Sequence, residues 1–234
     1  MTDGVPENLA TSTCPCGRVQ ALCVCPAAPV IDNKVAVLIL QHPQEQDRVL
    51  GTARMLERCL GTARVTVGLS WRNLGHATHA GTEQAAPGSR QWGVLYLGSG
   101  RLGDRPPGSP PLVALDRKGE ALADQASGLA GLEGIVALDG NWAQAKALWW
   151  RNAWLTRLRR LVVVPQERSL YGNLRKEARP DAVSTLEAVA LALSVLEHDD
   201  SVRERLLAPF RELIRRARAA GVRDSKRDRR RPRR

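Results

Sequence analysis

The sequence predicts an α/β protein with a mostly parallel β-sheet covered by helices on both faces. Three observations lead to this prediction. Short apolar runs alternate with helix-forming segments along the chain. Residues 134–152, GIVALDGNWAQAKALWWRN, join an apolar run to an amphipathic segment through Asp139 and Gly140, which is typical of a strand, a tight turn and a helix. The 234 residues suffice for one good-sized core.

Each predicted strand is a short apolar run. These runs are 34–40, 63–67, 93–97, 112–115, 135–138 and 161–164. Helical patterns cover 48–60, 119–128, the segment that Asn141 opens, 184–197 and 202–219. Ser184 and Glu187 have the spacing of a capping box. Because parallel strands end at one edge of a sheet, the loops after Leu97, Leu138 and Val164 should meet where such sheets bind ligands.

Composition and charge narrow the class of protein. No apolar run approaches the roughly 20 residues of a membrane-spanning helix, and the first residues lack the basic start and apolar core of a secretory signal. We therefore expect a soluble, cytoplasmic protein. The net charge is +11, and residues 223–234 hold eight basic and two acidic side chains. Such a tail is typical of nucleic-acid-binding proteins, although a solubilising disordered tail has the same composition.

Four of the five cysteines lie within twelve residues, at Cys14, Cys16, Cys23 and Cys25. In a cytoplasmic protein this density favours metal binding over disulfides. Two pairs of thiolates from two turns can close a tetrahedral Cys₄ site for structural Zn²⁺. The alternative is a group of redox-labile thiols near a flexible terminus. The fifth cysteine, Cys59, lies in a helical pattern and is expected to fill the core.

Asp139 is the candidate catalytic residue, because it ends an apolar strand at the ligand-binding edge of the predicted sheet. Four of the six tryptophans follow it, at Trp142, Trp149, Trp150 and Trp154. A carboxylate there can take a proton from a substrate. It can also cap the next helix or hold the turn. We expect at least two of the four tryptophans to belong to the core.

Other loops at the same edge supply further candidates. Pro43 ends the first strand and places His42 and Glu45 in a loop. The glycine-rich turn after Leu97 lets backbone N–H groups approach a ligand. The polar loop that begins at Pro165 is unusually long, which is typical of functional loops.

Several motifs, in one order, resemble the DTW-domain family. They are LILQHPQEQDRVLGTARMLE, LDGNW followed by WWRN, P-x₃-S-x-Y-x₂-LRK and STLEA, together with the cysteine cluster. The resemblance covers residues 14–198. It departs from the family at two points. Asn141 stands where the family's D-x-T-W has threonine, and the cluster begins C-x-C rather than C-x₂-C. Asparagine keeps an acceptor that can cap a helix, but it has no hydroxyl.

Membership of this family implies a tRNA-uridine aminocarboxypropyltransferase. Such enzymes move the 3-amino-3-carboxypropyl group of S-adenosylmethionine to N3 of a tRNA uridine and release methylthioadenosine. The implied fold is SPOUT-like, an α/β sheet with a trefoil knot in its C-terminal half. Asp139 is then the expected base, with Asn141 and Trp142 completing the motif. The indole of Trp142 can stack on adenine or on a splayed uridine.

The resemblance also implies a pocket for S-adenosylmethionine. The expected contacts are Leu97, Gly98, Ser99, Leu138, Pro165, Ser169, Tyr171, Arg175, Lys176, Ser184, Thr185 and Glu187. Arg175 is the first choice for clamping the carboxylate of the transferred group, and Arg54 is the next. Either can equally be an ordinary surface or phosphate-contacting arginine. His42, Pro43 and Glu45 are expected at the pocket entrance, although a lone histidine after a strand is more often structural.

We therefore expect three regions. They are an N-terminal segment, 1–33, with the zinc-like cluster, a catalytic domain, 34–220, and a disordered basic tail, 221–234. The expected partner is tRNA, with no membrane or DNA, and the sequence leaves the oligomeric state open. Two alternatives for function also stay open. One is a SPOUT-type RNA methyltransferase, and the other is a non-catalytic RNA-binding protein with the same fold.

Overall fold

One mixed sheet organises the computed structural model, which describes residues 14, 16–78, 91–95, 109–175 and 182–222. Its strands are β1 (Ala36–Gln41), β2 (Ala63–Val67), β3 (Trp92–Leu95), β4 (Leu112–Leu115), β5 (Gly134–Asp139) and β6 (Arg159–Val163). They lie in the order β2-β1-β5-β3-β6-β4. Neighbouring strands are parallel except β4 and β6, which are antiparallel. The predicted α/β class with a mostly parallel sheet is confirmed.

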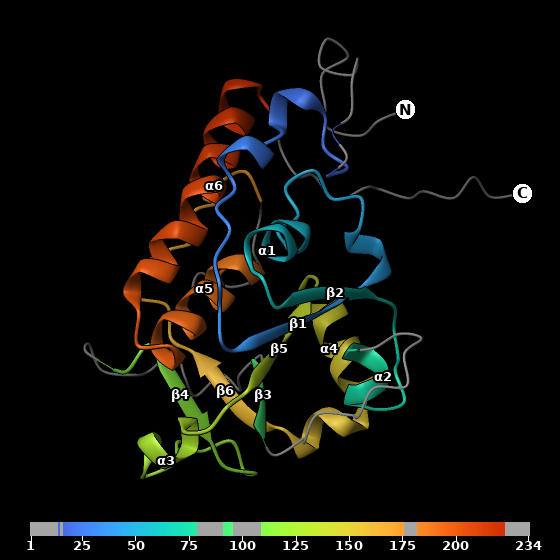
Figure 1. The fold of residues 1–234 in the computed structure, drawn as a ribbon. Coiled ribbons are helices and arrows are strands. Elements are labelled where there is room, and N and C mark those ends of the chain that lie inside the picture. The colour runs from blue at the N-terminus through green and yellow to red at the C-terminus, as the bar shows by residue number, and fades with distance from the viewer. Residues whose placement is uncertain (1–13, 15, 79–90, 96–108, 176–181, 223–234) are drawn as a thin grey trace, which may run out of the picture.

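Helices cover both faces of this sheet. They are α1 (Ala53–Cys59), α2 (Leu74–Thr78), α3 (Gln125–Leu129), α4 (Trp142–Arg151), α5 (Thr185–Leu196) and α6 (Asp200–Ala219). Short 3-10 helices are η2 (Gln20–Leu22), η3 (Cys25–Ala27), η4 (Pro43–Glu45) and η7 (Ala153–Arg157). Helices α5 and α6 lie on one side of the sheet, and α2 and α4 lie on the other (Figure 1). None of the described helices combines the length and apolarity that crossing a membrane requires.

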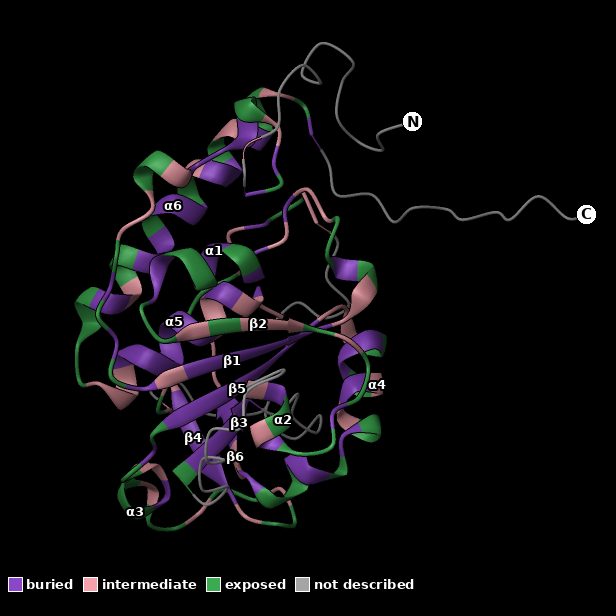
Figure 2. Ribbon diagram, turned by 45° about the vertical axis from the view of Figure 1, so that its right-hand side comes forward, coloured by how far each residue is buried: buried purple, intermediate pink, exposed green. Residues whose placement is uncertain are grey.

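The alternation of side chains along β5 decides which helix each residue faces. Ile135 and Ala137 belong to the apolar cluster of α1, α5 and α6, whereas Val136 and Leu138 belong to the cluster of α2 and α4. Every residue of β5 is buried, and the strand runs through the middle of the sheet (Figure 2). Asp139 continues the first set, so its carboxylate is directed to the side of α5.

The N-terminal segment shares this core. Leu22, Val24 and Ile31 are buried in the same cluster as α5 and α6, and Ile31 forms an isolated parallel bridge with Leu60. The described part of the segment predicted as residues 1–33 therefore packs against the same core as the sheet. Its boundary as a separate region stays a prediction. Most of the predicted basic tail lies outside the described residues.

Helix α1 is shorter than predicted. The pattern over 48–60 indicated one helix, but α1 begins at Ala53. Residues before it form successive turns, in which the N–H of Arg48 donates to Glu45 and the N–H of Gly51 donates to Arg48. Their carbonyls are used elsewhere: Tyr171 and Arg18 donate to the carbonyl oxygens of residues 50 and 51. Tertiary hydrogen bonds thus replace the first helical turn.

Helix α3 also begins later than predicted, at Gln125 rather than at residue 119. The carboxylate of Asp116 accepts the backbone N–H groups of Lys118 and Glu120. This closes a turn in which Gly119 has a φ of 85°, a conformation that glycine adopts without strain. The trefoil knot stays a prediction, because the loops 96–108 and 176–181 lie outside the described residues.

We predict that Gly134→Ala destabilises the sheet. A Cβ atom at Gly134 would lie 2.5 Å from indole atoms of Trp92 on the neighbouring strand. Trp92 is buried, so the ring has little room to move, and we expect a loss of about 1–3 kcal/mol. Thermal unfolding measures the change. Gly61→Ala is the control, since its Cβ would meet only the carbonyl oxygen of Ile31, at 3.6 Å. Equal melting temperatures for the two variants would contradict the prediction.

Candidate functional site

Asp139 ends β5 in a buried polar site whose two carboxylate oxygens are both held. Oδ2 accepts a hydrogen bond from Nε2 of Gln41 at 2.8 Å, and Oδ1 accepts one from the hydroxyl of Thr185 at 2.6 Å. The side chain of Asp139 is only 7% exposed. Gln41 is the β1 residue directly opposite Asp139 in the strand register. The carboxylate is therefore fixed by a neighbouring strand and by a helix.

Helix α5 begins at this carboxylate. Ser184 is its N-cap, and the reciprocal hydrogen bonds between Ser184 and Glu187 form the predicted capping box. Thr185, whose hydroxyl reaches Asp139, is the first residue of the helix. The first turn of α5 therefore lies beside the carboxylate of Asp139.

Asn141, and not Asp139, caps the helix that follows the motif. Its side-chain oxygen accepts from the N–H of Gln144, and the side chain of Gln144 accepts in return from the N–H of Asn141. Nε2 of Gln144 also donates to Gln44 at 3.2 Å. The alternative interpretation, in which Asp139 caps α4, is therefore wrong. Half-buried Trp142 begins α4, on the opposite face of the sheet from α5.

Glu187 ties the loop after β6 to helix α5. Its carboxylate accepts from the hydroxyl of Ser169 at 2.8 Å, from the N–H of Leu170 at 2.7 Å and from the N–H of Ser184 at 2.7 Å. Pro165 and Glu187 also line a cleft of about 40 Å³ beside α5 and α6, which has room for little more than water. Four predicted pocket residues are thus close together.

Arg175 lies with Glu45 and Tyr171. Its Nη2 is 3.0 Å from Oε2 of Glu45, which is only 3% exposed, and its guanidinium lies 5.4 Å from the centre of the Tyr171 ring. Tyr171 is buried and donates its hydroxyl to the carbonyl oxygen of Leu50 at 2.8 Å. The Tyr171 side chain therefore belongs to the core, and the predicted ligand contact of this residue is left to its backbone.

The other arginine candidate lies elsewhere. Arg54 is exposed on α1, and its Nη1 lies 2.7 Å from the place that a Cβ atom of Gly17 would occupy. The structure thus puts Arg54 against the cysteine-bearing segment, whereas Arg175 lies with Glu45. The choice between the two candidates for a carboxylate clamp stays a prediction.

His42 has a structural role in the loop after β1. Its N–H donates to the carbonyl of Asp139 at 2.9 Å, and its Nδ1 accepts from the N–H of Gln44 at 3.2 Å. Partial burial lowers the pKa of His42, so the ring is neutral near pH 7, as an accepting Nδ1 requires. Pro43 is the first residue of η4. These contacts shape the segment that leads from Gln41 to Glu45.

The tryptophans divide between the core and the surface. Trp154 is buried and donates its Nε1–H to the carbonyl of Trp71 at 3.1 Å. Trp149 is half-buried against the same cluster, whereas Trp150 is 76% exposed. Of the four, Trp154 is a buried core residue and Trp149 only packs against the same cluster, so the prediction that at least two belong to the core is met in full by Trp154 alone and in part by Trp149. Leu138 is buried on the α4 face. Leu97, Gly98, Ser99 and Lys176 lie outside the described residues.

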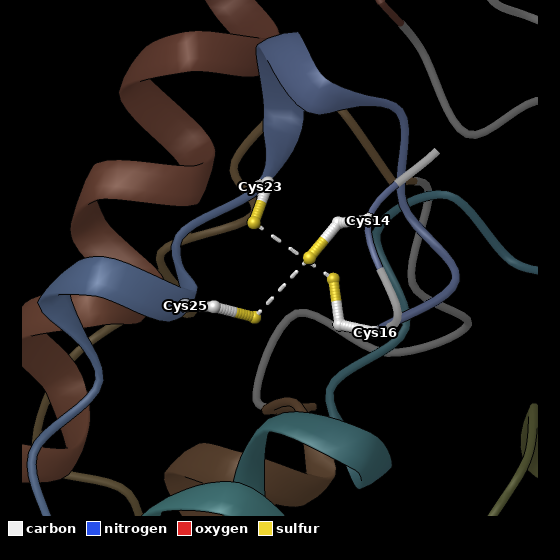
Figure 3. Close-up of side chains that lie close together, drawn as sticks. All are labelled: Cys14, Cys16, Cys23 and Cys25. Carbon is white, nitrogen blue, oxygen red and sulfur yellow. Dashed lines mark hydrogen bonds between the residues drawn. The ribbon is translucent and has the colours of Figure 1, made fainter. Parts of the chain in front are cut away.

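The four clustered cysteines converge on one point (Figure 3). Their sulfur atoms lie within 4.8 Å of one another, with 3.8 Å between Cys14 and Cys25 and 4.0 Å between Cys16 and Cys23. All four thiols are free. A Zn–S bond of about 2.3 Å in a tetrahedron separates neighbouring sulfurs by about 3.8 Å. The donor set and its spacing therefore fit zinc.

The thiol of Cys25 is held in its protonated form by its surroundings. Burial, together with the three neighbouring thiols, raises the pKa of Cys25 to about 12. A thiol in that condition stays protonated at neutral pH, whereas a metal ligand must be a thiolate. Metal binding would therefore release protons.

Two arginines attach the cysteine-bearing segment to the rest of the molecule. Arg18 is 9% exposed and donates to the carbonyl oxygen of Gly51, just before α1. Arg216, near the end of α6, donates to the carbonyl oxygen of Cys23. The cluster is thus held between the turn that precedes α1 and the C-terminal part of α6.

Gln41 is the site residue that the sequence analysis missed. A usable signal was present, because Gln41 directly follows the apolar run of β1 just as Asp139 follows that of β5. Polar residues that end adjacent parallel strands meet at the same edge of a sheet. The register that places the two opposite each other became known only from the structure.

The sequence of this chain is similar to those of known proteins. The family model of the DTW domain matches residues 12–218. A tRNA-uridine aminocarboxypropyltransferase 2 of Drosophila melanogaster is 31% identical over 210 residues, which are 89% of this chain and 75% of that protein. The protein of the same name from Mus musculus is 30% identical over 85% of this chain and 60% of its own length. No solved structure gives a significant match. The chain belongs to the DTW-domain family.

We predict that Asn141→Ala destabilises the protein by about 1 kcal/mol, because it removes the N-cap acceptor of α4. Asn141→Thr should cost only a few tenths of that, because threonine keeps a capping oxygen. Chemical denaturation measures both changes. If threonine destabilised the protein as much as alanine, capping would not be what asparagine contributes at this position.

Proposed function

We propose that this protein transfers the 3-amino-3-carboxypropyl group of S-adenosylmethionine to N3 of a uridine in tRNA. The proposal rests mainly on the position of Asp139. The acid of the family motif ends the buried central strand, and both of its oxygens are oriented. The relatives bear the name of this activity. The chain spans 60% of the length of the mouse relative.

The reaction needs a base and an aligned electrophile. Uridine N3 becomes nucleophilic when its proton is removed, and Asp139 takes that proton. N3 then bonds to the carbon beside the sulfonium, the carbon–sulfur bond breaks, and its electron pair stays on sulfur as methylthioadenosine leaves. A positioned base contributes typically ~10²–10⁴ in rate. Alignment of the two reactants supplies most of the rest.

Gln41 and Thr185 orient the carboxylate of Asp139 for proton transfer. Both are hydrogen-bond donors to its carboxylate, which suits an ionised group that only accepts. Fixing the carboxylate before the substrate binds removes reorganisation from the reaction. Arg175 is the proposed clamp for the carboxylate of the transferred group, and Trp142 is the proposed stacking surface for a base.

We also propose that the four-cysteine cluster holds a structural zinc ion. The ligands would be Cys14, Cys16, Cys23 and Cys25, whose sulfur spacing fits a tetrahedron. Zinc bound there would fix the turn in which Gly17 has a φ of 82°. It would thereby hold Arg18 against the residues that precede α1.

We predict that Asp139→Asn lowers the transfer rate by about 10²–10⁴ with little effect on folding. Asparagine can still accept from Gln41, and its amide can donate to the hydroxyl of Thr185. The measurement is mass spectrometry of nucleosides from tRNA incubated with S-adenosylmethionine, together with detection of methylthioadenosine. The control is Asp32→Asn, an exposed carboxylate, which should keep full activity.

Three outcomes of this assay would change the proposal. Full activity in Asp139→Asn would show that Asp139 is not the base. S-adenosylhomocysteine as the by-product would identify an RNA methyltransferase. Binding of tRNA without any binding of S-adenosylmethionine would leave a non-catalytic RNA-binding protein.

We predict that the purified protein contains one zinc ion per chain by elemental analysis. Cys16→Ser should lose the metal and lower the melting temperature, because a structural zinc site contributes several kcal/mol to folding. Cys59→Ala should keep the metal, since Cys59 is buried in α1 away from the cluster. A zinc content that is unchanged in Cys16→Ser would argue against the cluster as the site.

A further inference from the structure

Gln41 has a buried acceptor that nothing in the described protein uses. Its Nε2 donates to Asp139 at 2.8 Å, but its Oε1 has no hydrogen-bond partner among the described residues, although the side chain is 97% buried. Turning the amide over would bring its oxygen against the carboxylate, so the orientation is fixed by Asp139. Buried polar atoms in native proteins are nearly always paired. A donor from outside the protein therefore fits this position.

A second acceptor lies on the same segment. Oε1 of Glu45 is buried and also has no hydrogen-bond partner within the described residues. Nε of Arg48 lies 3.7 Å from this oxygen, beyond hydrogen-bond distance. The other oxygen of Glu45 is bound to Arg175. Residues 41–45 thus present two acceptors, one of them charged, next to an arginine.

The proposed reaction offers few donors that can occupy this place. The N3 proton of the uracil goes to Asp139, and the two carbonyl groups beside N3 are acceptors. The adenine amine lies at the far end of S-adenosylmethionine from the reacting carbon, and the ribose hydroxyls of that molecule are separated from the reacting carbon by the sulfur atom and at least three carbons. The ribose hydroxyls of the uridine lie on the N1 side of the uracil, away from N3. The α-ammonium of the aminocarboxypropyl group is two carbons from that carbon, and it carries three N–H donors and a positive charge. It is the donor that can reach a group adjoining Asp139.

We propose that Gln41 is a binding and specificity residue that accepts a hydrogen bond from the α-ammonium of the transferred group. Glu45 supplies the matching negative charge, and Arg175 faces the carboxylate of the same group. Gln41 would then join the two halves of the reaction, since one end of its amide orients the base and the other end holds the amino acid moiety. This inference rests on the proposed function and names how that site recognises its substrate.

The test compares two ligands that differ in the amino acid moiety. S-adenosylhomocysteine contains it, and methylthioadenosine does not. Calorimetry with the full chain should give tighter binding of S-adenosylhomocysteine by the wild type. Gln41→Met, which is similar in length and apolar, should weaken that ligand by at least about tenfold, the loss of a hydrogen bond to a charged group. Methylthioadenosine should bind with unchanged affinity.

Gln46→Met is the matched control, because it makes the same change on the same segment at an exposed side chain. It should bind both ligands as the wild type does. An equal loss for both ligands in Gln41→Met, or no loss for either, would overturn the inference. Failure of the wild type to bind S-adenosylmethionine or S-adenosylhomocysteine at all would instead overturn the proposed function.

Gln41→Glu separates the two ends of the amide and covers the case in which methionine prevents folding. Glutamate keeps an acceptor for the ammonium, so S-adenosylhomocysteine should bind within about threefold of wild type. It loses the donor to Asp139 and adds a like charge, so the transfer rate should fall. Weakening of S-adenosylhomocysteine by tenfold or more in this variant would contradict the role of the acceptor.

Discussion

The hydrogen bond between Gln41 and Asp139 depends on the register of two parallel strands, and the site depends on that hydrogen bond. β1 and β5 pair so that the last residue of each lies opposite the other. Both side chains then point to the face that α5 covers, where the hydroxyl of Thr185 completes the set. A shift of one residue would turn one of the two side chains to the α4 face. The pairing of β1 with β5 therefore determines which side chain orients the carboxylate of Asp139.

The arrangement of helices on both faces of a mostly parallel sheet could be predicted from the sequence, because buried parallel strands are apolar throughout and are easily recognised. The motif acid and the clustered cysteines were found for a similar reason, since their residue types are unusual at such spacings. Gln41 follows an apolar run just as Asp139 does, but its pairing with Asp139 depends on the strand order and register, which the sequence does not reveal. The late start of α1 was missed because distant side chains, Tyr171 and Arg18, use the carbonyls that precede it. Local patterns carry no information about such partners.

The two helices beside the site begin in the same way and act on different parts of it. Ser184 caps α5 and thereby sets the hydroxyl of Thr185 toward the carboxylate. Asn141 caps α4 and sets the first turn that carries Trp142. The threonine of the family motif and Asn141 of this chain can therefore both cap the N-terminus of α4. The hydroxyl that touches the acid comes from α5 and not from the D-x-T-W motif.

The contact between Cys23 and Arg216 joins residues that are 193 positions apart. Synthesis of a chain proceeds from the N-terminus, so the thiols leave the ribosome long before the helix that shelters them exists. During that interval the thiols lack the burial that the finished fold gives to Cys16 and Cys23. Early capture of zinc would protect them while the rest is made. The cluster would then be among the first parts of the protein to fold.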